Sequence, residues 1–380
     1  MSVTFMATFT LQSLGISVSS EILIFTVLTF LSSYLLYFPF IKLCHERGWV
    51  DKPTISRKVH KQAVATSGGV IFIAVFLASI LFFSAHHTIE HLNYLIFGLC
   101  LVLLIGLKDD FMAISPHIRL FAHFVISVAT VWVLELEVST FVGLFGIQSI
   151  PAPVASLVGI FAMMTIINAY NLIDGIDGLA ASMAILASVG FCIGFIAFGE
   201  PLWAAVSCLF AASLAGFVLH NKQPASVFMG DAGSVSVGYM VAIQALMFLR
   251  ISTTSLTPTP VGETLAPIAP IYAMALLCIP LFDLLQVMVF RMVRGQSPFT
   301  ADQKHIHHIL LQQGLSHGFA TMVCVVWSLM MVAAAILLGQ VMSITLAFLV
   351  LLNAMVLFLL AMEFVPYMIY RIVRGDIGEE

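Results

Sequence analysis

Residues 319–338 read FATMVCVVWSLMMVAAAILL, a run of 20 residues without a charged side chain. A helix needs about 20 predominantly apolar residues to cross the hydrocarbon core of a bilayer. This run is therefore long enough to cross a membrane as a single helix. The stretch 342–365 is almost as apolar and follows directly, so this part of the chain predicts two consecutive membrane spans.

The composition of the whole chain agrees with this reading. Of its 380 residues, 61% are hydrophobic and only 9% are Asp, Glu, Lys or Arg. A soluble domain has about 45–50% apolar and about 25% charged residues. The shortage of charge excludes a soluble globular enzyme, a disordered chain and a nucleic-acid-binding domain. We therefore predict an all-α polytopic membrane protein.

Apolar runs of suitable length predict about eleven transmembrane helices. For the stretch 138–153, a loop and a short re-entrant hairpin are both open. The runs lie at 21–43, 67–85, 92–107, 119–134, 153–170, 178–198, 201–220, 234–250, 266–290, 319–338 and 342–365.

Lys and Arg side chains indicate the orientation of these spans. If the N-terminus is outside, every Lys and Arg except Arg250 falls on the inner side, as expected for cytoplasmic loops. We therefore predict that the N-terminus is outside and the C-terminus cytoplasmic, with 1–380 forming a single integral membrane domain. The predicted cytoplasmic loops lie near 44–66, 108–118, 171–177, 221–233 and 291–318.

Acidic residues at the inner ends of spans are candidates for function, because charge is costly in a membrane. Asp109 and Asp110 close the third run. Two adjacent carboxylates repel each other unless a cation, a proton or Lys108 relieves them. A solvated helix end with a local ion pair is the alternative for this pair.

A second polar cluster follows the fifth run, with amides and carboxylates spaced by three residues: Asn168, Asn171, Asp174 and Asp177. Neighbours in this series face each other on a helix. The series drifts around the helix axis, however, so all four share one site only if the helix unwinds near Gly175 and Gly178. Such groups pack poorly in an apolar span, which favours a functional role.

Two further clusters lie before the eighth run and after the ninth. Asp231 follows a glycine at a predicted helix start, where it is either a simple N-cap or the ligand of a cation that bridges phosphates. His305, His307 and His308 lie in a polar loop. Without nearby cysteines, oxygen donors dominate, which favours magnesium over zinc. Asp283, inside the ninth run, is expected to pair with a polar neighbour.

Carboxylates, histidines and cations therefore collect on one face of the membrane. A metal ion that neutralises phosphate oxygens, with basic groups beside it, is what a diphosphate substrate requires. A site at the inner boundary suits one water-soluble phosphate substrate and one lipid substrate.

Together these motifs resemble the polyprenyl-phosphate N-acetylhexosamine-1-phosphate transferases. VDKP (50–53) and SPF (297–299) are similar to the WecA-type branch rather than the MraY branch. The motifs that carry the resemblance are GLKDD (106–110), NAYNLIDGIDGLA (168–180), VFMGDAGS (227–234) and HIHH (305–308).

The resemblance implies transfer of GlcNAc-1-phosphate from UDP-GlcNAc to undecaprenyl phosphate. The products are undecaprenyl-diphosphate-GlcNAc and UMP, and the step is the first lipid-linked one of a bacterial surface polysaccharide such as lipopolysaccharide O-antigen. It implies Mg²⁺, with Mn²⁺ as a substitute, and an active site on the cytoplasmic face of the bacterial inner membrane. The expected partners are the two substrates and the membrane but no nucleic acid, and a homodimer is left open.

The resemblance also implies roles for individual residues. Asp231 is the expected metal ligand. The expected catalytic residues are Asp109, Asp110, His305, His307 and His308. The expected substrate-binding residues are Lys61, Arg119, Asn171, Asp174, Asp177, Phe228 and Lys304. Among these, Asp109 and Asp110 are expected near the attacking lipid phosphate and Phe228 against the uracil.

Two alternatives stay open from the sequence. A secondary transporter with an Asp/His proton relay is the alternative function, although transporters tend to bind substrate at the membrane midplane between internal repeats. For the transferase, direct attack by the lipid phosphate is preferred over a covalent aspartyl-phosphate, because a phosphate monoester is already largely ionised at neutral pH.

Overall fold

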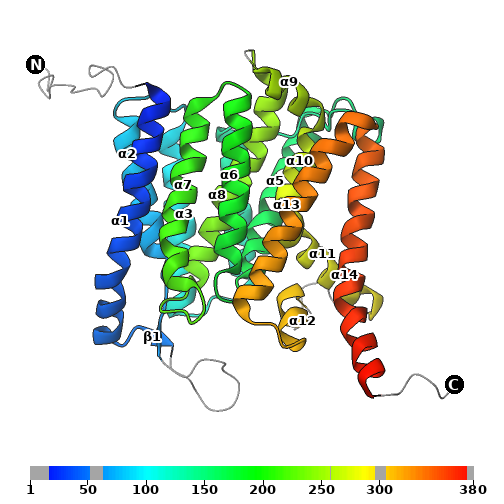
Figure 1. The fold of residues 1–380 in the computed structure, drawn as a ribbon. Coiled ribbons are helices and arrows are strands. Elements are labelled where there is room, and N and C mark those ends of the chain that lie inside the picture. Colours follow the sequence, from blue (N-terminus) through cyan, green and yellow to red (C-terminus); the bar gives the residue numbers. More distant parts are fainter. Residues whose placement is uncertain (1–16, 52–62, 257, 296–304, 375–380) are drawn as a thin grey trace, which may run out of the picture.

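The computed structural model describes residues 17–51, 63–256, 258–295 and 305–374, with the side chains of these except His307 and 363–374. Its helices run side by side in one bundle (Figure 1). In chain order the elements are α1 (Val18–Arg47), β1 (Val50–Asp51), β2 (Val64–Ala65), α2 (Gly69–Ser84), α3 (Leu92–Phe111), α4 (Pro116–Val133), η2 (Leu144–Gly146), α5 (Ala152–Ile173), α6 (Leu179–Ala197), α7 (Pro201–Asn221), α8 (Gly230–Thr254), α9 (Pro260–Leu265), η3 (Ala266–Ile268), α10 (Ala269–Leu276), α11 (Cys278–Val293), α12 (Ile306–Gln312), α13 (His317–Val341) and α14 (Ile344–Arg374).

The predicted helical architecture is confirmed, with the antiparallel pair β1–β2 as a small addition in the described residues. Each predicted run coincides with a helix or a helix pair. Nine helices of the described part are long and apolar enough to cross a membrane, and a tenth span results if the pair Pro260–Leu276 and Cys278–Val293, bent by 64°, crosses as one. The chain is therefore a multi-pass membrane protein.

The difference from the predicted eleven spans comes from α2. It has 16 residues, which reach about 24 Å at about 1.5 Å per residue. That length is short of a hydrocarbon core of about 30 Å. For 138–153, the loop reading is confirmed: the segment contains the short turn η2, and α5 begins at Ala152.

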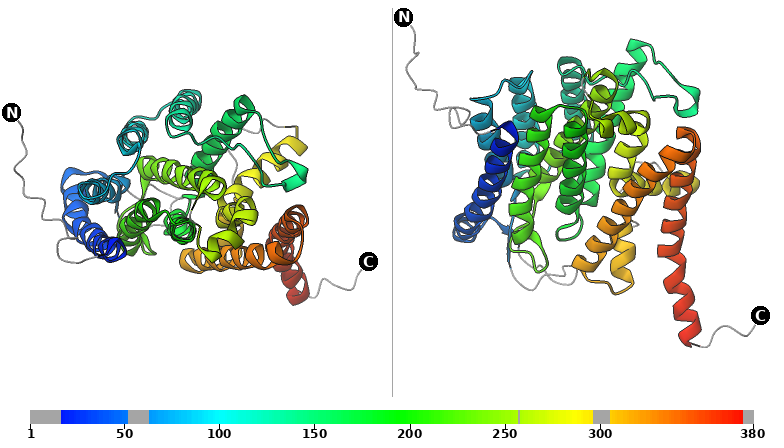
Figure 2. Two further views of the ribbon diagram at one scale, coloured as in Figure 1. Left: turned by 90° about the horizontal axis from the view of Figure 1, so that it is seen from above. Right: turned by 45° about the horizontal axis from the view of Figure 1, so that its top comes forward.

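Helix α8 is the centre of the bundle. Every residue from Ala232 to Phe248 is buried, and the view from above shows other helices around it (Figure 2). A helix that is apolar on all sides is typically buried in this way. The outer helices instead expose large apolar side chains, such as Leu23 of α1 and Trp132 of α4, as expected where lipid replaces water.

Glycines bring α2 and α3 into backbone contact with the beginning of α8. A Cβ on Gly106 of α3 would lie 2.5 Å from the Cα of Ala232, and a Cβ on Gly69 of α2 would overlap the backbone of Gly233. Only a residue without a side chain permits such close crossings. The end of α3 is therefore held directly against the start of α8.

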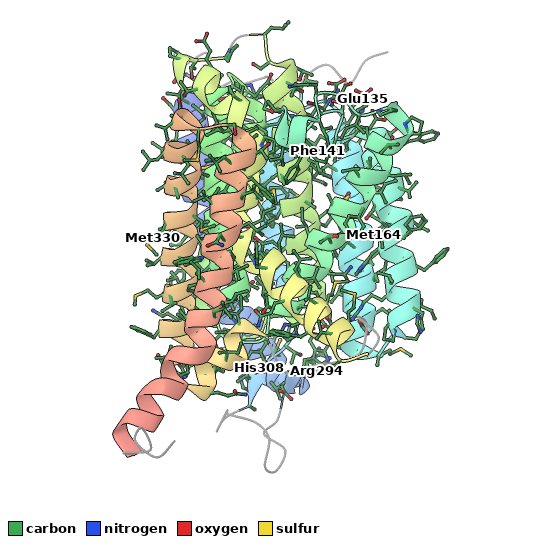
Figure 3. The ribbon with its side chains drawn as sticks, turned by 90° about the vertical axis from the view of Figure 1, so that its right-hand side faces the viewer. Glu135, Phe141, Met164, Arg294, His308 and Met330 are labelled. Carbon is green, nitrogen blue, oxygen red and sulfur yellow. The ribbon has the colours of Figure 1, made fainter. Side chains whose placement is uncertain are left out.

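The two ends of the bundle carry different groups. Glu135, which follows α4, lies at one end, whereas Arg294 and His308 lie at the other (Figure 3). Near the second end, α3, α5 and α7 finish and α8 and α13 begin, and we call it the site end.

Candidate active site

A cavity of about 390 Å³ lies at the site end, where the ends of α3, α5 and α7 meet the starts of α8 and α13. The structure thus brings together three motifs that are far apart in the sequence. The predicted site residues that line the cavity are Asp110, Asn171, Asp174, Asp177, Phe228 and Asp231.

Asp110 connects α3 to the start of α8. The backbone N–H of Asp231 donates to Asp110 Oδ1 at 2.6 Å, and that of Ala232 donates to Asp110 Oδ2 at 3.4 Å. These are N–H groups that a helix start leaves unpaired, and a carboxylate satisfies them well. Asp110 rather than Asp231 therefore caps α8, so the N-cap alternative for Asp231 is wrong.

Gly230 makes this contact possible. It has φ +75, and a Cβ at this position would lie 2.6 Å from Asp110 Oδ2. A larger residue would be strained there and would push the carboxylate of Asp110 away.

Asp109, the neighbour of Asp110, makes different contacts. Its Oδ1 accepts from the backbone N–H of Ile114, and its Oδ2 from Arg119 Nη1, both at 2.7 Å. Asp109 therefore fixes the turn between α3 and α4 and holds Arg119, and it is not among the described residues that line the cavity. Arg119 Nη1 also lies 3.7 Å from Asp231 Oδ1, which places a positive charge beside the cavity.

Asn171 orients the carboxylate of Asp231. Its Nδ2 donates to Asp231 Oδ1 at 2.7 Å and to Ser234 Oγ at 2.9 Å. Asn168, one turn earlier, instead donates to the carbonyl of Met164 in its own helix. The spacing of three therefore brings Asn171 into the site but not Asn168.

The turn after α5 carries two carboxylates. The helix ends at Ile173, and Gly178 follows with φ +81, so the predicted unwinding near the glycines is confirmed. The backbone N–H of Gly178 donates to Asn221 Oδ1 at 2.8 Å, which ties the turn to the end of α7. Asp174 and Asp177 of this turn both reach the cavity.

Negative charge is concentrated at this point. Burial raises the pKa of Asp174 well above its usual range, and the carboxylates of Asp231, Asp110 and Asp177 raise it further. Burial disfavours an ionised carboxylate, and like charges disfavour it as well. The cavity is therefore arranged to accept positive charge.

Phe228 is held at the cavity by its backbone. Its N–H donates to the carbonyl of Ala65 in β2, and its carbonyl accepts from the N–H of Gly68, each at 2.8 Å. The small sheet therefore has a structural purpose: it fixes the strand-like segment before α8 that carries this aromatic ring.

His317 and Asn221 also line the cavity, and sequence reasoning missed both. His317 is the first residue of α13 and only 6% exposed. Its Nδ1 lies 3.3 Å from both the backbone N and Oδ2 of Asp177. A single histidine 140 residues from its partner carries no spacing pattern, so only the fold reveals it.

The histidine motif forms a second cluster. His305 Nδ1 lies 2.7 Å from Asp283 Oδ2, and the backbone N–H of Ile306 donates to Asp283 Oδ1 at 2.6 Å. Asp283 therefore pairs with a polar neighbour, as predicted, and joins α11 to α12. Burial lowers the pKa of His308, and His305 lowers it further against the opposing effect of Asp283. Among the described residues that line the cavity, neither histidine is present.

Three other predicted residues fall outside this description. Lys61 and Lys304 lie outside the described residues, as does the side chain of His307.

The donor atoms of the cavity suit a hard divalent cation. The lining offers carboxylates from Asp110, Asp174, Asp177 and Asp231 and an amide from Asn171. In the part of the chain that the structure describes, no three His, Cys, Asp or Glu side chains are grouped to hold a metal ion by themselves. Mg²⁺ is usually bound by one or two carboxylates together with substrate phosphates. The residues therefore fit an Mg²⁺ whose ligands come partly from these side chains and partly from the oxygens of a diphosphate.

Comparison with known proteins identifies the family of the chain. Residues 92–249 match Glycosyl transferase family 4. The undecaprenyl-phosphate alpha-N-acetylglucosaminyl 1-phosphate transferase of Salmonella typhi is 31% identical over 311 residues, which cover 78% of this chain and 77% of that protein. The chain belongs to glycosyl transferase family 4. The resemblance to the polyprenyl-phosphate N-acetylhexosamine-1-phosphate transferases is thereby confirmed.

Two further relatives of this glycosyl transferase are similar over most of their length. The probable undecaprenyl-phosphate N-acetylglucosaminyl 1-phosphate transferase of Bacillus subtilis is 30% identical over 283 residues, 73% of each chain. The undecaprenyl-phosphate alpha-N-acetylglucosaminyl 1-phosphate transferase of Escherichia coli K12 is 29% identical over 299 residues, 76% of each chain. The segment matched to the family runs from α3 into α8, whereas His317 lies beyond it.

Proposed function

We propose that this family 4 transferase moves GlcNAc-1-phosphate from UDP-GlcNAc to undecaprenyl phosphate. The products are undecaprenyl-diphosphate-GlcNAc and UMP, and the product lipid begins a bacterial surface polysaccharide such as O-antigen. The membership of the family supports a transferase over the alternative of a transporter, and the names of the relatives support these substrates.

The observation that carries the proposal is the convergence of carboxylates on one cavity at the end of a membrane bundle. Asp110, Asp174, Asp177 and Asp231 come from three separate segments and line the same space. The Nη1 atom of Arg119 lies 3.7 Å from Asp231 Oδ1. A polyanion with a divalent cation satisfies such a site, because the cation relieves the repulsion among the carboxylates.

We assign the parts of the donor to the parts of the cavity. Asp231, oriented by Asn171, is the proposed ligand of Mg²⁺, which supplies positive charge to the two phosphates when bound. Arg119 is the proposed cation for a phosphate oxygen. Phe228 and the turn with Asp177 are the proposed contacts of the nucleoside. His305, His307 and His308 remain proposed catalytic residues, together with Lys61 and Lys304 as substrate contacts.

Direct transfer is the proposed reaction. An oxygen of the lipid phosphate attacks the β-phosphorus of UDP-GlcNAc and forms the new P–O bond. The bond from this phosphorus to the bridging oxygen breaks, and UMP leaves with that oxygen. The chain positions the two phosphates and shields them from water, since little covalent chemistry is required of a protein in phosphoryl transfer. Asp110 holds the start of α8, and so Asp231, in place during this step.

The proposed location of the site is the cytoplasmic side of the bacterial inner membrane. The predicted orientation places the site end inside, where nucleotide sugars are made. Mg²⁺ is the proposed cofactor, with Mn²⁺ as a substitute.

The test is an assay of the purified protein in detergent with UDP-GlcNAc, undecaprenyl phosphate and Mg²⁺. We expect release of UMP in equal amount to a new lipid whose mass is that of undecaprenyl-diphosphate-GlcNAc. Chelation with EDTA is expected to stop the reaction, and added Mg²⁺ to restore it. Release of UMP without the lipid product would contradict the proposal, and so would activity that survives the chelator.

A second arm distinguishes the two mechanisms. The protein is incubated with UDP-GlcNAc carrying a labelled β-phosphate, without lipid acceptor. Direct attack predicts that no label stays on the denatured protein. A labelled phosphosugar attached to the chain would establish the covalent alternative instead.

A further inference from the structure

The beginning of α13 contacts both the backbone N–H and the backbone carbonyl of Asp177. The backbone N–H of Asp177 donates to His317 Nδ1 at 3.3 Å. Thr321 Oγ1, one turn further along α13, donates to the carbonyl of Asp177 at 3.5 Å. The first of these is the shorter contact, and it lies in the wall of the cavity, because Asp177 and His317 are both lining residues.

This hydrogen bond assigns the acceptor atom of the histidine ring. A ring nitrogen that accepts a backbone N–H carries no hydrogen, so the proton of a neutral imidazole lies on the other nitrogen, Nε2. His317 Nδ1 also lies 3.3 Å from Asp177 Oδ2. The lone pair of Nδ1 does not attract the carboxylate of Asp177. We therefore infer that His317 holds Asp177 through its backbone N–H and not through its side chain.

The turn that carries Asp177 is held at two successive peptide groups. His317 of α13 holds the N–H of Asp177, and Asn221 of α7 holds the N–H of Gly178. Neither partner belongs to the turn itself. If His317 is lost, the turn is still held by Asn221 and Thr321, but the N–H of Asp177 loses this partner in the wall of the cavity.

We propose that His317 is a positioning residue for the donor nucleotide, acting through Nδ1 on the turn that carries Asp177. This inference rests on the proposed function, in which that turn contacts the nucleoside. In the proposed function the phosphates lie with Asp231 on α8 and Arg119 on α4, whereas the contact of His317 described above is with the turn of Asp177. His317 therefore sets the affinity for the uridine nucleotide and leaves the rate of phosphoryl transfer nearly unchanged.

Three substitutions of His317 distinguish the role of Nδ1 from that of Nε2. In His317→Asn the amide lies near the position of Nδ1, so it can still accept from Asp177. In His317→Gln the amide lies near the position of Nε2, and His317→Ala removes both. Loss of the acceptor leaves a backbone N–H of the cavity wall without this partner. A tenfold change in affinity corresponds to about 1.4 kcal/mol.

We expect the Ala and Gln variants to raise the KM for UDP-GlcNAc and the Kd for UMP by about tenfold. The Asn variant is expected to stay close to the wild type. For all three, kcat and the KM for undecaprenyl phosphate are expected to change little. Thr321→Val, which removes the weaker contact, is expected to have a smaller effect on the same constants.

The Kd is measured by calorimetric titration of the purified protein with UMP, and thermal unfolding is recorded for each variant. A merely structural histidine would lower the unfolding temperature in all three variants without rescue by Asn. The inference is overturned if the Ala variant binds UMP as tightly as the wild type, if Asn is as impaired as Ala, or if kcat falls while KM is constant. A wild type that binds no uridine nucleotide would instead contradict the proposed function.

Discussion

Asp109 and Asp110 are neighbours in the chain, yet their carboxylates serve different contacts. Asp109 holds Arg119 and the turn after α3, whereas Asp110 accepts two N–H groups at the start of α8. Sequence reasoning could identify the pair as important. It could not divide the roles, because Asp110 is defined by a contact with a residue 121 positions away.

Asp110→Ala is the first test at this scale. Loss of a capping side chain costs about 0.5–2 kcal/mol, so we expect a lower unfolding temperature together with a strong loss of UMP release. Asp110→Asn keeps an acceptor and is expected to retain more of the stability. A protein with Ala at this position that unfolds like the wild type would contradict the capping role.

Asp231→Asn is expected to reduce turnover by about 10²-fold or more, as is typical when a group that stabilises transition-state charge is lost. The unfolding temperature should change little, because Asp231 is partly exposed at the cavity. The rate of UMP release is measured against Mg²⁺ concentration, with Glu90→Gln, an exposed acid between α2 and α3, as the matched control. Wild-type turnover in the Asn variant would remove Asp231 as the metal ligand.

His308 provides a prediction about pH. Its pKa is lowered, so the imidazole stays neutral as the pH falls below the ordinary histidine value of about 6.5. Diethyl pyrocarbonate modifies only the neutral ring, so the rate of modification of His308, located by mass spectrometry, is expected to have its pH midpoint below that of N-acetylhistidine. His305→Gln removes one cause of the lowered pKa and is expected to move the midpoint upward. A midpoint at or above 6.5 in the wild type would contradict the assignment.

At the scale of elements, the contact between α3 and α8 decides the geometry of the site. Gly106 allows the two backbones to touch, and Asp110 follows it by one turn. Apolar runs reveal where such helices are, because composition alone decides membrane insertion. They do not reveal which helices cross, since that depends on small residues placed among many similar ones.

Gly106→Ala tests this crossing. Its Cβ would meet the backbone of Ala232, and overpacking of this kind costs about 1–3 kcal/mol. The shift also moves Asp110, so we expect turnover to fall by about tenfold or more. Gly318→Ala in α13 is the control, because nothing lies within 4 Å of the added Cβ. Equal behaviour of the two variants, in unfolding temperature and in UMP release, would show that the crossing tolerates a side chain.

The run 266–290 is predicted as one continuous helix, whereas the structure breaks it. It contains η3, α10 and α11, and the two arms of the pair that includes them are bent by 64°. Pro280 has no N–H to donate to the carbonyl four residues earlier, and its ring crowds that carbonyl. The break at Leu277 therefore has a cause that the sequence contains, although hydrophobicity alone does not express it.

At the scale of the whole molecule, the sequence placed most of the chemistry at one end of the bundle, and the cavity at the site end agrees with it. The residue types and the end could be predicted, because acidic motifs interrupt apolar runs at their ends. The remaining residues of the cavity wall could not be predicted, because His317 and Asn221 belong to no sequence motif. The orientation of the bundle in the membrane is still a prediction.

Cysteine labelling tests that orientation. In a variant without the six native cysteines, Glu90→Cys and Glu263→Cys are expected to react with a membrane-impermeant maleimide in intact cells. Lys222→Cys, at the end of α7, is expected to react only after the membrane is permeabilised. All three positions are exposed. The reverse pattern would place the cavity outside, away from the supply of UDP-GlcNAc.

The entry of α13 into the cavity wall has a consequence for how such enzymes diversify. The carboxylates that line the cavity, Asp110, Asp174, Asp177 and Asp231, belong to 92–249, but His317 comes from a helix beyond that segment. A chimera that keeps the first part of this chain and takes its last third from a relative would keep the four cavity carboxylates while exchanging both the histidine motif and the proposed positioning residue His317. If the proposed role of His317 holds, the affinity of such a chimera for the uridine nucleotide follows the origin of α13, whereas its cation site follows the origin of α8.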